Sequence, residues 1–182
     1  MPRKNRQWHE GAILHVTVRG NRRSDIFKSE EDYCVYLGNL QHAIRFYNNE
    51  FEILSYCLMT NHIHLQIETK NVHIKKLMSR INTFYAKYFN DKYDYQGHLF
   101  QGRYGSQIID SDGYILEVSR YISLNPVRAN IVEKPEDYKW SSYPMLIGKT
   151  KEKLINSDRI LSYFVQSRKR ELYRMYVESA MR

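Results

Sequence analysis

The sequence has little cysteine and no long apolar run. Two cysteines in 182 residues, Cys34 and Cys57, are too few for a disulfide scaffold or a zinc ribbon, and we expect a reducing, cytoplasmic setting. No apolar stretch approaches the roughly 18 residues of a membrane-spanning helix, and none follows the basic N-terminal residues as it would in a signal peptide. The pattern G-x-x-x-x-G-K-[ST] is missing too, so the sequence predicts no P-loop nucleotide site.

What is present is an ordinary globular composition with an uneven charge. Hydrophobic residues make up 42% and charged residues 26% of the chain, which excludes a wholly disordered protein. Residues 1–28 hold seven basic and two acidic residues and residues 149–182 hold nine and four, a net charge of +5 in each segment. Solubilising ends and a footprint for a polyanion, nucleic acid above all, are both compatible with this charge. Among the 16 tyrosines, some could stack on unpaired bases.

Hydrophobic periodicity predicts four strands and three helices. The strands are expected at 12–19, 52–59, 62–68 and 103–109, and the helices at 33–47, 74–88 and 111–123. Ser29 and Asp32 have the spacing of a capping box before the first helix. The order β-α-β-β-α-β predicts an α+β, ferredoxin-like split β-α-β fold, an antiparallel sheet with helices on one face and the polar face open. We expect residues 1–148 to form this domain and residues 149–182 to form a basic, helical C-terminal extension.

Two histidines in the third predicted strand are candidate metal ligands. His62 and His64 are two residues apart, so their side chains point to the same face of a strand and can reach one metal ion. The alternative is a pair of hydrated surface histidines, because the pattern H-x-H is short and unspecific. Two histidines also leave a metal site incomplete, so a third ligand has to come from another element.

The third predicted helix offers candidates for that element. Tyr121 and Asn125 are four residues apart and share one helix face if the helix extends that far. Asn125 precedes Pro126, a pair that also fits the N-cap and first position of a new short helix. Asn125 is therefore a candidate ligand, a candidate cap, or both.

Five blocks of sequence, in this order and at this spacing, resemble the single-tyrosine HUH transposases, and most closely the REP-associated tyrosine transposases. The match covers about residues 8–145. The blocks are His15–Arg22, Met59–His64, Gly97–Tyr104, Arg120–Ala129 and Trp140–Tyr143.

The resemblance implies a specific chemistry. Members of this family cut and rejoin single-stranded DNA on a ferredoxin-like core, and carry-over by position makes Tyr121 the nucleophile and His62 and His64 the ligands of a divalent ion, Mg²⁺ or Mn²⁺. Asn125 lies where relatives place a further polar ligand, which is Gln in some of them. The product of attack is a 5′-phosphotyrosine and a free 3′-OH, which needs no nucleotide cofactor.

The expected partner is single-stranded, hairpin-forming DNA, and no membrane association is expected. We expect the protein in the cytoplasm, at the nucleoid. A homodimer is one of the assemblies found among relatives. Basic and aromatic residues in predicted loops and at strand ends are candidate DNA contacts. They are Arg19, Arg22, Arg23, Arg103 and Tyr104.

Other functions compete with this one. The main alternative is a catalytically silent, single-stranded nucleic-acid-binding protein derived from a transposase. A two-histidine phosphoesterase needs two H-x-[ST] motifs, and His15-Val16-Thr17 is the only one in the sequence. A structural metal protein lacks thiol ligands and leaves Tyr121 without a role.

Overall fold

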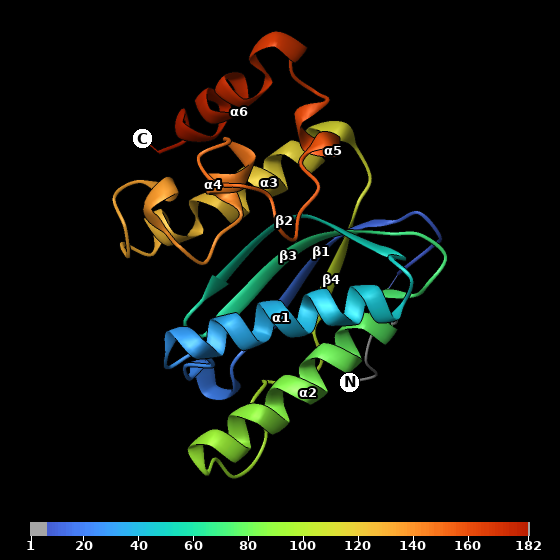
Figure 1. The fold of residues 1–182 in the computed structure, drawn as a ribbon, viewed down its shortest axis with the longest axis vertical. Helices are drawn as coiled ribbons and strands as arrows, with labels where there is room; N and C mark the ends of the chain where they lie inside the picture. Colours follow the sequence, from blue (N-terminus) through green and yellow to red (C-terminus); the bar gives the residue numbers. More distant parts are fainter. Residues whose placement is uncertain (1–6, 182) are drawn as a thin grey trace.

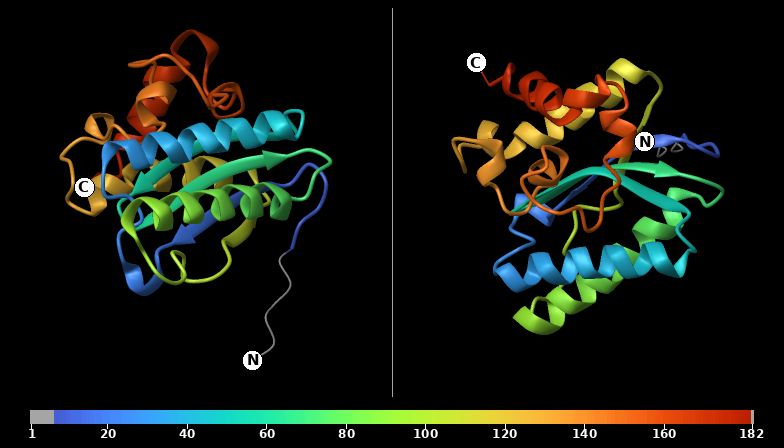
Figure 2. Two further views of the ribbon diagram at one scale, coloured as in Figure 1. Left: turned by 60° about the horizontal axis from the view of Figure 1, so that its bottom comes forward. Right: turned by 45° about the horizontal axis from the view of Figure 1, so that its top comes forward.

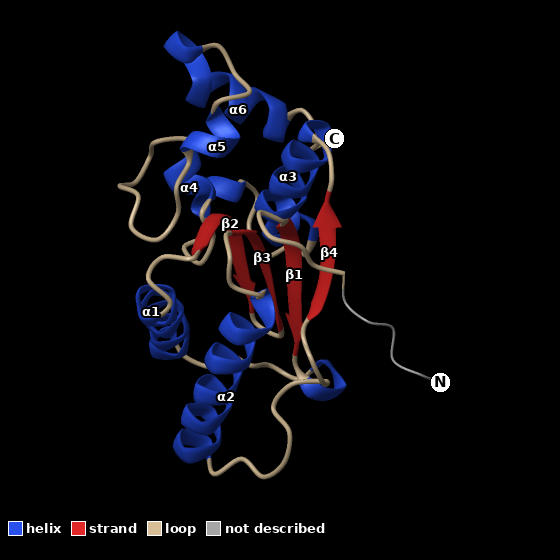
Figure 3. Ribbon diagram, turned by 90° about the vertical axis from the view of Figure 1, so that its right-hand side faces the viewer, coloured by secondary structure: helices blue, strands red, loops and turns tan. Residues whose placement is uncertain are grey.

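A four-stranded antiparallel sheet forms the centre of the computed structural model, which describes residues 7–181 (Figure 1). Residues 1–6, which carry three basic residues of the positively charged N-terminal segment, lie outside the described residues. The strands lie in the order β2-β3-β1-β4, which Figure 3 shows side by side. Their bounds are β1 (Ile13–Arg19), β2 (Phe51–Met59), β3 (His62–Thr69) and β4 (Gly105–Ile109). Because β1 and β2 both pair antiparallel with β3 between them, the expected split β-α-β topology is confirmed.

Two long helices, α1 (Glu30–Phe46) and α2 (Ile74–Tyr93), cover one face of the sheet, as predicted (Figure 1). The predicted capping box begins α1. The Asp32 carboxylate accepts hydrogen bonds from the backbone N–H groups of Lys28 and Ser29, at 2.7 and 2.9 Å. This carboxylate also meets Lys92 at 2.7 Å and Tyr93 at 2.8 Å, so it ties the start of α1 to the end of α2.

The opposite face of the sheet is not open, contrary to the sequence-based expectation. Helix α3 (Asp112–Arg128) packs on this face, mainly against β2 and β3, and the right-hand view of Figure 2 shows it on the side of the sheet away from α1 and α2. Gln66, predicted on a solvated face, is fully buried; its amide donates to the Ile115 carbonyl at 3.0 Å and accepts from the Ser55 hydroxyl at 2.8 Å. A buried amide is tolerated when it is hydrogen-bonded in this way. Alternation along a strand identifies its polar side, but it cannot show what covers that side.

Helix α3 is also longer than expected. It begins after Ser111, whose hydroxyl accepts from the Tyr114 N–H, and it continues through Pro126 to Arg128. The interpretation of Asn125 as the N-cap of a separate short helix is therefore wrong. Backbone hydrogen bonds from Ala129 to Asn125 and from Ile131 to Pro126 hold the turn beyond the proline ring, so the chain stays helical there.

The C-terminal part of the chain packs on α3 and on the outer edge of β2. Figure 2 shows its helices on the side of the sheet away from α1 and α2. Tyr173 and Val177 are fully buried, and short backbone bridges from Ser141 and Ile155 cover the edge of β2. Residues before and after position 148 contribute to one core, and the domain boundary stays a prediction. The helices are α4 (Tyr143–Leu146), α5 (Asp158–Leu161) and α6 (Lys169–Glu178), and the 3-10 turns are Asn21–Arg23, Pro135–Asp137 and Gln166–Arg168.

Between residues 7 and 181, no helix is both long and apolar enough to cross a bilayer.

Candidate functional site

Two imidazole rings on β3 lie together on the face that α3 covers. His62 and His64 have ring centroids 5.0 Å apart, and their rings meet at 88°. Strand pleating puts both on one side, while Ile63 between them is buried on the other side. The structure therefore brings the two predicted ligands together.

A third histidine, His15 on β1, holds His64 in place. The Nε2 atom of His15 lies 2.9 Å from Nδ1 of His64, and the two rings stack with centroids 5.2 Å apart. The strand register explains this contact, because Thr17 pairs with His64 and His15 is its diagonal neighbour on the same face. His15 was visible in the sequence as part of an H-x-T motif, but its partner was not, because strand register was unknown.

The Nδ1 atom of His62 also has a hydrogen-bond partner. It lies 2.6 Å from Oδ1 of Asn61, at the turn between β2 and β3. Nδ1 of each ligand candidate is thus held by a neighbour, and among the described residues neither Nε2 atom has a hydrogen-bond partner. Holding one ring nitrogen fixes the tautomer and the orientation of a metal-binding histidine.

Burial keeps these imidazoles neutral. Desolvation, reinforced by the positive charges of His15, His62 and Arg19, lowers the pKa of His64 to about 3. Desolvation also lowers the pKa of His15, and desolvation together with Arg19 lowers the pKa of His62. A metal ion binds only a neutral imidazole, so at neutral pH both candidates are in the form that binds.

Tyr121 on α3 lies over this cluster. Its ring centroid is 5.4 Å from that of His64 and 5.9 Å from that of His15, and both contacts are edge-on. Of the tyrosines in residues 7–181, Tyr121 is the only one with an exposed ring, at 40%. By contrast, burial raises the pKa of Tyr56 to about 12. Tyr121 is therefore the tyrosine best placed to meet a substrate beside the histidines.

A shallow cavity of about 460 Å³ opens next to Tyr121. His15 and Tyr121 form one part of its wall, and Glu117, Arg120 and Arg128 form another. The Arg128 guanidinium lies over the Tyr121 ring, 5.4 Å from its centroid. A cation at this position stabilises a tyrosine phenolate or an incoming phosphate. Neither Glu117 nor Arg128 was predicted as a site residue, because only the helix geometry places them around Tyr121.

These residues fit a divalent ion in part. His62 and His64 supply two neutral ring nitrogens, and two nitrogen ligands leave positions for oxygen ligands and substrate. In the described part of the chain, however, no group of three or more His, Cys, Asp or Glu side chains is close enough to hold a metal ion. An additional ligand therefore has to be an amide, water or substrate oxygen.

Asn125 lies one helical turn beyond Tyr121 and is nearly buried, at 9% exposure. Its side-chain N–H group donates to the Tyr121 carbonyl at 3.3 Å, which leaves its amide oxygen as an acceptor. The hydrogen bond ties Asn125 to the turn that carries Tyr121. Its role as a metal ligand stays a prediction.

The predicted DNA-contacting arginines lie at the end of the sheet where β3 begins. Arg19 pairs with His62 across the strands, and its carbonyl accepts from the Gln101 N–H at 2.9 Å. Arg22 and Arg23 lie in the adjacent 3-10 turn, and Arg103 lies in the loop that Gln101 belongs to. All four are exposed. Two loops far apart in the sequence thus bring these cations to one edge, next to the histidines.

Tyr104 does not fit the role predicted for it. Its side chain is only 6% exposed and belongs to the hydrophobic core. A ring buried to this extent offers no face to a DNA base, so base stacking by Tyr104 is a prediction that the structure contradicts.

Comparison with known proteins gives the family. The sequence profile of the family described as "Transposase IS200 like" matches residues 9–125, well over half of the chain. No curated protein matches the chain in sequence.

Two solved structures are similar in fold. One is a REP-associated tyrosine transposase bound to a REP hairpin, with a TM-score of 0.69 and 19% identity over 85% of this chain and 90% of that one. The other is a protein from Deinococcus radiodurans R1 described as a transposase, with a TM-score of 0.45 and 15% identity over 66% of this chain and 95% of that one. The family profile spans the histidine pair and Tyr121, and the chain belongs to the IS200-like, single-tyrosine HUH transposase family.

Proposed function

We propose that this protein is a metal-dependent endonuclease and strand transferase that acts on single-stranded DNA through Tyr121. Family membership supports the reaction class. The observation that carries the assignment to residues is the position of Tyr121, an exposed ring whose centroid lies 5.4 Å from the buried, neutral His64. A nucleophile and a candidate metal ligand from two different elements thus meet at one point.

The proposed step is one displacement at phosphorus. The Tyr121 hydroxyl oxygen attacks the scissile phosphate, the bond from phosphorus to the 3′ oxygen breaks, and a 5′-phosphotyrosine and a free 3′-OH result. The phenolic proton passes to water, and the departing 3′ oxygen takes up a proton. A second 3′-OH attacking the phosphotyrosine reverses the step and joins the strands, so no external energy source is needed.

His62 and His64 would hold a Mg²⁺ or Mn²⁺ ion, with Asn125 as a candidate third ligand. Such an ion neutralises charge on the scissile phosphate and polarises it. Other side chains of this protein would orient the ligands and supply charge at the nucleophile. His15 and Asn61 orient the two ligands through their Nδ1 atoms, and Arg128 supplies positive charge at the Tyr121 ring.

Hairpin-forming single-stranded DNA is the substrate that we propose. The structural neighbour is described as bound to a REP hairpin, and four exposed arginines lie at the edge next to His62 in this chain. Tyr121 and the histidines lie together within one chain, which supports a site formed by a single protomer. We propose a location at DNA in the cytoplasm, and a homodimer stays an expectation.

The test is a denaturing-gel assay for a covalent protein–DNA adduct. Wild type is incubated with labelled hairpin oligonucleotides in Mn²⁺, in Mg²⁺ or in chelator, beside Tyr121→Phe. As a matched control, Tyr176→Phe removes the hydroxyl of a half-buried tyrosine on α6. We expect a metal-dependent adduct with wild type and Tyr176→Phe, and none with Tyr121→Phe. An adduct that persists in Tyr121→Phe would overturn the assignment of the nucleophile.

The same assay separates the catalytically silent alternative. A protein that binds hairpin oligonucleotides tightly and gives no adduct under any metal condition would be a DNA-binding protein that has lost cleavage.

A further inference from the structure

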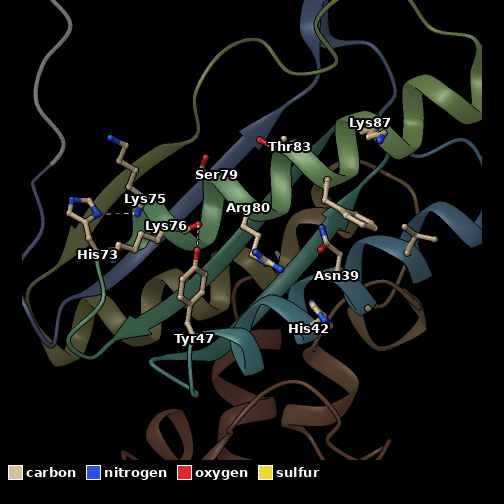
Figure 4. A pocket seen from close by; sticks show the side chains of 13 residues that line it. Asn39, His42, Tyr47, His73, Lys75, Lys76, Ser79, Arg80, Thr83 and Lys87 are labelled. Carbon is tan, nitrogen blue, oxygen red and sulfur yellow. Dashed lines mark hydrogen bonds between the residues drawn. The ribbon is translucent and has the colours of Figure 1, made fainter.

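A large hollow in the described part of the molecule lies away from the proposed catalytic face, the side of the sheet that carries His62 and His64 and that α3 covers with Tyr121. A groove of about 1240 Å³ runs between α1 and α2, on the side of the sheet opposite to α3 (Figure 4). Val35, Asn39 and Tyr47 line it from the side of α1, and Phe84 lines it from α2. Nothing in the reaction proposed above uses this groove.

The charge that lines the groove has one sign. Lys75, Lys76, Arg80 and Lys87 all lie along it, and among its described lining residues none is acidic. Within residues 7–181, none of these four side chains forms an ion pair with a carboxylate. Four uncompensated cations attract an anionic occupant and repel a second copy of the same surface.

The cations have a regular spacing. Lys76, Arg80 and Lys87 recur at intervals of four and seven residues, which places them in one stripe along α2. At about 1.5 Å per residue the stripe is roughly 16 Å long, enough for several phosphates of one strand spaced at about 3.4 Å or more. A row of cations on a rigid helix therefore fits a linear polyanion better than a compact one.

Exposed aromatic rings accompany the cations. Phe84 within the groove is 56% exposed, and Phe46 at the end of α1 is 55% exposed. The Arg80 guanidinium already stacks over the Phe46 ring, 3.7 Å from its centroid. Cations beside exposed aromatic rings suit a single strand, because the cations can pair with its phosphates and its bases can stack on the rings.

We propose that the groove between α1 and α2 is a second binding site for single-stranded nucleic acid, separate from the catalytic face. Lys76, Arg80 and Lys87 bind phosphates of the strand, and Phe84 stacks on a base. The inference rests on the proposed function for its ligand, because a DNA substrate held at Tyr121 presents its single-stranded tail to this groove at a high effective concentration.

The test measures the binding of a fluorescent oligo-dT strand by anisotropy over a range of salt concentrations. The groove variants are Arg80→Gln/Lys87→Gln and Phe84→Ala. As a control with the same change of charge, Arg45→Gln/Lys70→Gln removes one exposed arginine and one exposed lysine that do not line the groove. Thermal unfolding checks that every variant is folded.

We expect the groove double variant to reduce the slope of log K against log[salt] by about 1.4, since each phosphate contact to a single strand contributes about 0.7. Phe84→Ala should weaken binding on the order of tenfold with little change in slope. A strand carrying 5-iododeoxyuridine should cross-link to Phe84 or Phe46, as mapped by mass spectrometry.

Equal slopes for the groove and control double variants, with no cross-link on α1 or α2, would overturn the proposal. Selective binding of oligoglutamate over oligo-dT to the groove would overturn it in favour of an acidic protein partner. The Tyr121 adduct assay keeps the two proposals apart. If wild type forms no covalent adduct, the proposed function is wrong. The salt slopes and cross-links still test whether the groove binds a single strand.

Discussion

The two faces of the sheet differ in the side chains that alternate residues of the same strands place on them. On β3, His62, His64 and Gln66 point toward α3, whereas Ile63, Leu65 and Ile67 point toward α1 and α2 and are fully buried. The first set consists of polar side chains, two of them titratable, and the second set consists of apolar side chains that pack in the core. Because strands alternate with a period of two, neighbouring substitutions on β3 should have opposite consequences for chemistry and for stability.

The largest effect is expected from the two histidines that we propose as metal ligands. His64→Ala, or chelation of the wild type, should reduce adduct formation about 10³-fold or more, since a metal ion supplies several kcal/mol to phosphoryl chemistry. The denaturing-gel assay measures this loss, and thermal unfolding of His64→Ala should stay cooperative. An adduct of wild-type yield in His64→Ala would show that this histidine is not a ligand.

A substitution at Leu65, next to His64 in β3, should instead reduce stability and leave the chemistry unchanged. Leu65→Ala should lower the free energy of unfolding by about 2–5 kcal/mol, because the side chain is fully buried and leaves a cavity against α1 and α2. Urea denaturation measures this change. The fraction that remains folded should form the Tyr121 adduct at the wild-type rate, and a slower rate per folded molecule would show that the two faces are coupled.

His15 should have a smaller effect, and one confined to the catalytic face. His15→Ala removes the partner of His64 Nδ1 and should weaken Mn²⁺ binding roughly 10- to 100-fold, as for other groups that orient metal ligands. Electron paramagnetic resonance of free Mn²⁺ measures the affinity without any turnover. His15→Gln can still hydrogen-bond to His64 and should recover part of the loss; equal affinities for all three proteins would remove His15 from the site.

The smallest effect is expected from substitution of Asp32, which lies in α1 on the side of the sheet opposite α3. Its hydrogen bonds from Lys92, Tyr93 and two backbone N–H groups outweigh burial and lower its pKa below the ordinary 3.8. This stabilisation is present above pH 3.8 and is lost as the pH falls below that value. Asp32→Asn should cost about 1.5 kcal/mol at neutral pH and flatten the decline in stability at acid pH. Urea titrations at several pH values measure both, and an unchanged acid profile would contradict this role.

Part of the fold and of the candidate site was predictable from sequence because the signals for it are local. The H-x-H spacing put His62 and His64 on one face, the strand pattern gave the topology, and Ser29 with Asp32 marked the start of α1. Order and spacing of five sequence blocks then singled out Tyr121. The histidine spacing, the strand pattern and the capping pair depend on residues close together in the chain, where periodicity and capping rules apply.

The remaining features depend on contacts between distant residues. His15 meets His64 through strand register, and Gln66 is buried because α3 happens to cross it. Pro126 misled the interpretation of Asn125, because a proline near a helix end can be accommodated by the backbone bonds around it. The groove between α1 and α2 exists only once the two helices are packed, although each of its cations is plain in the sequence.

The attachment of α3 to α6 has a mechanical consequence. In the proposed reaction, a DNA strand joined to Tyr121 would transmit any tension along its length directly to α3. That helix is fastened from behind by the buried contact between Ser119 and Tyr173, at 2.7 Å, and by the Arg120 guanidinium, 4.5 Å from the centroid of the Tyr176 ring. Helix α6 would then hold α3 in place under that tension, while the strand pairing of the sheet holds the histidines on β3.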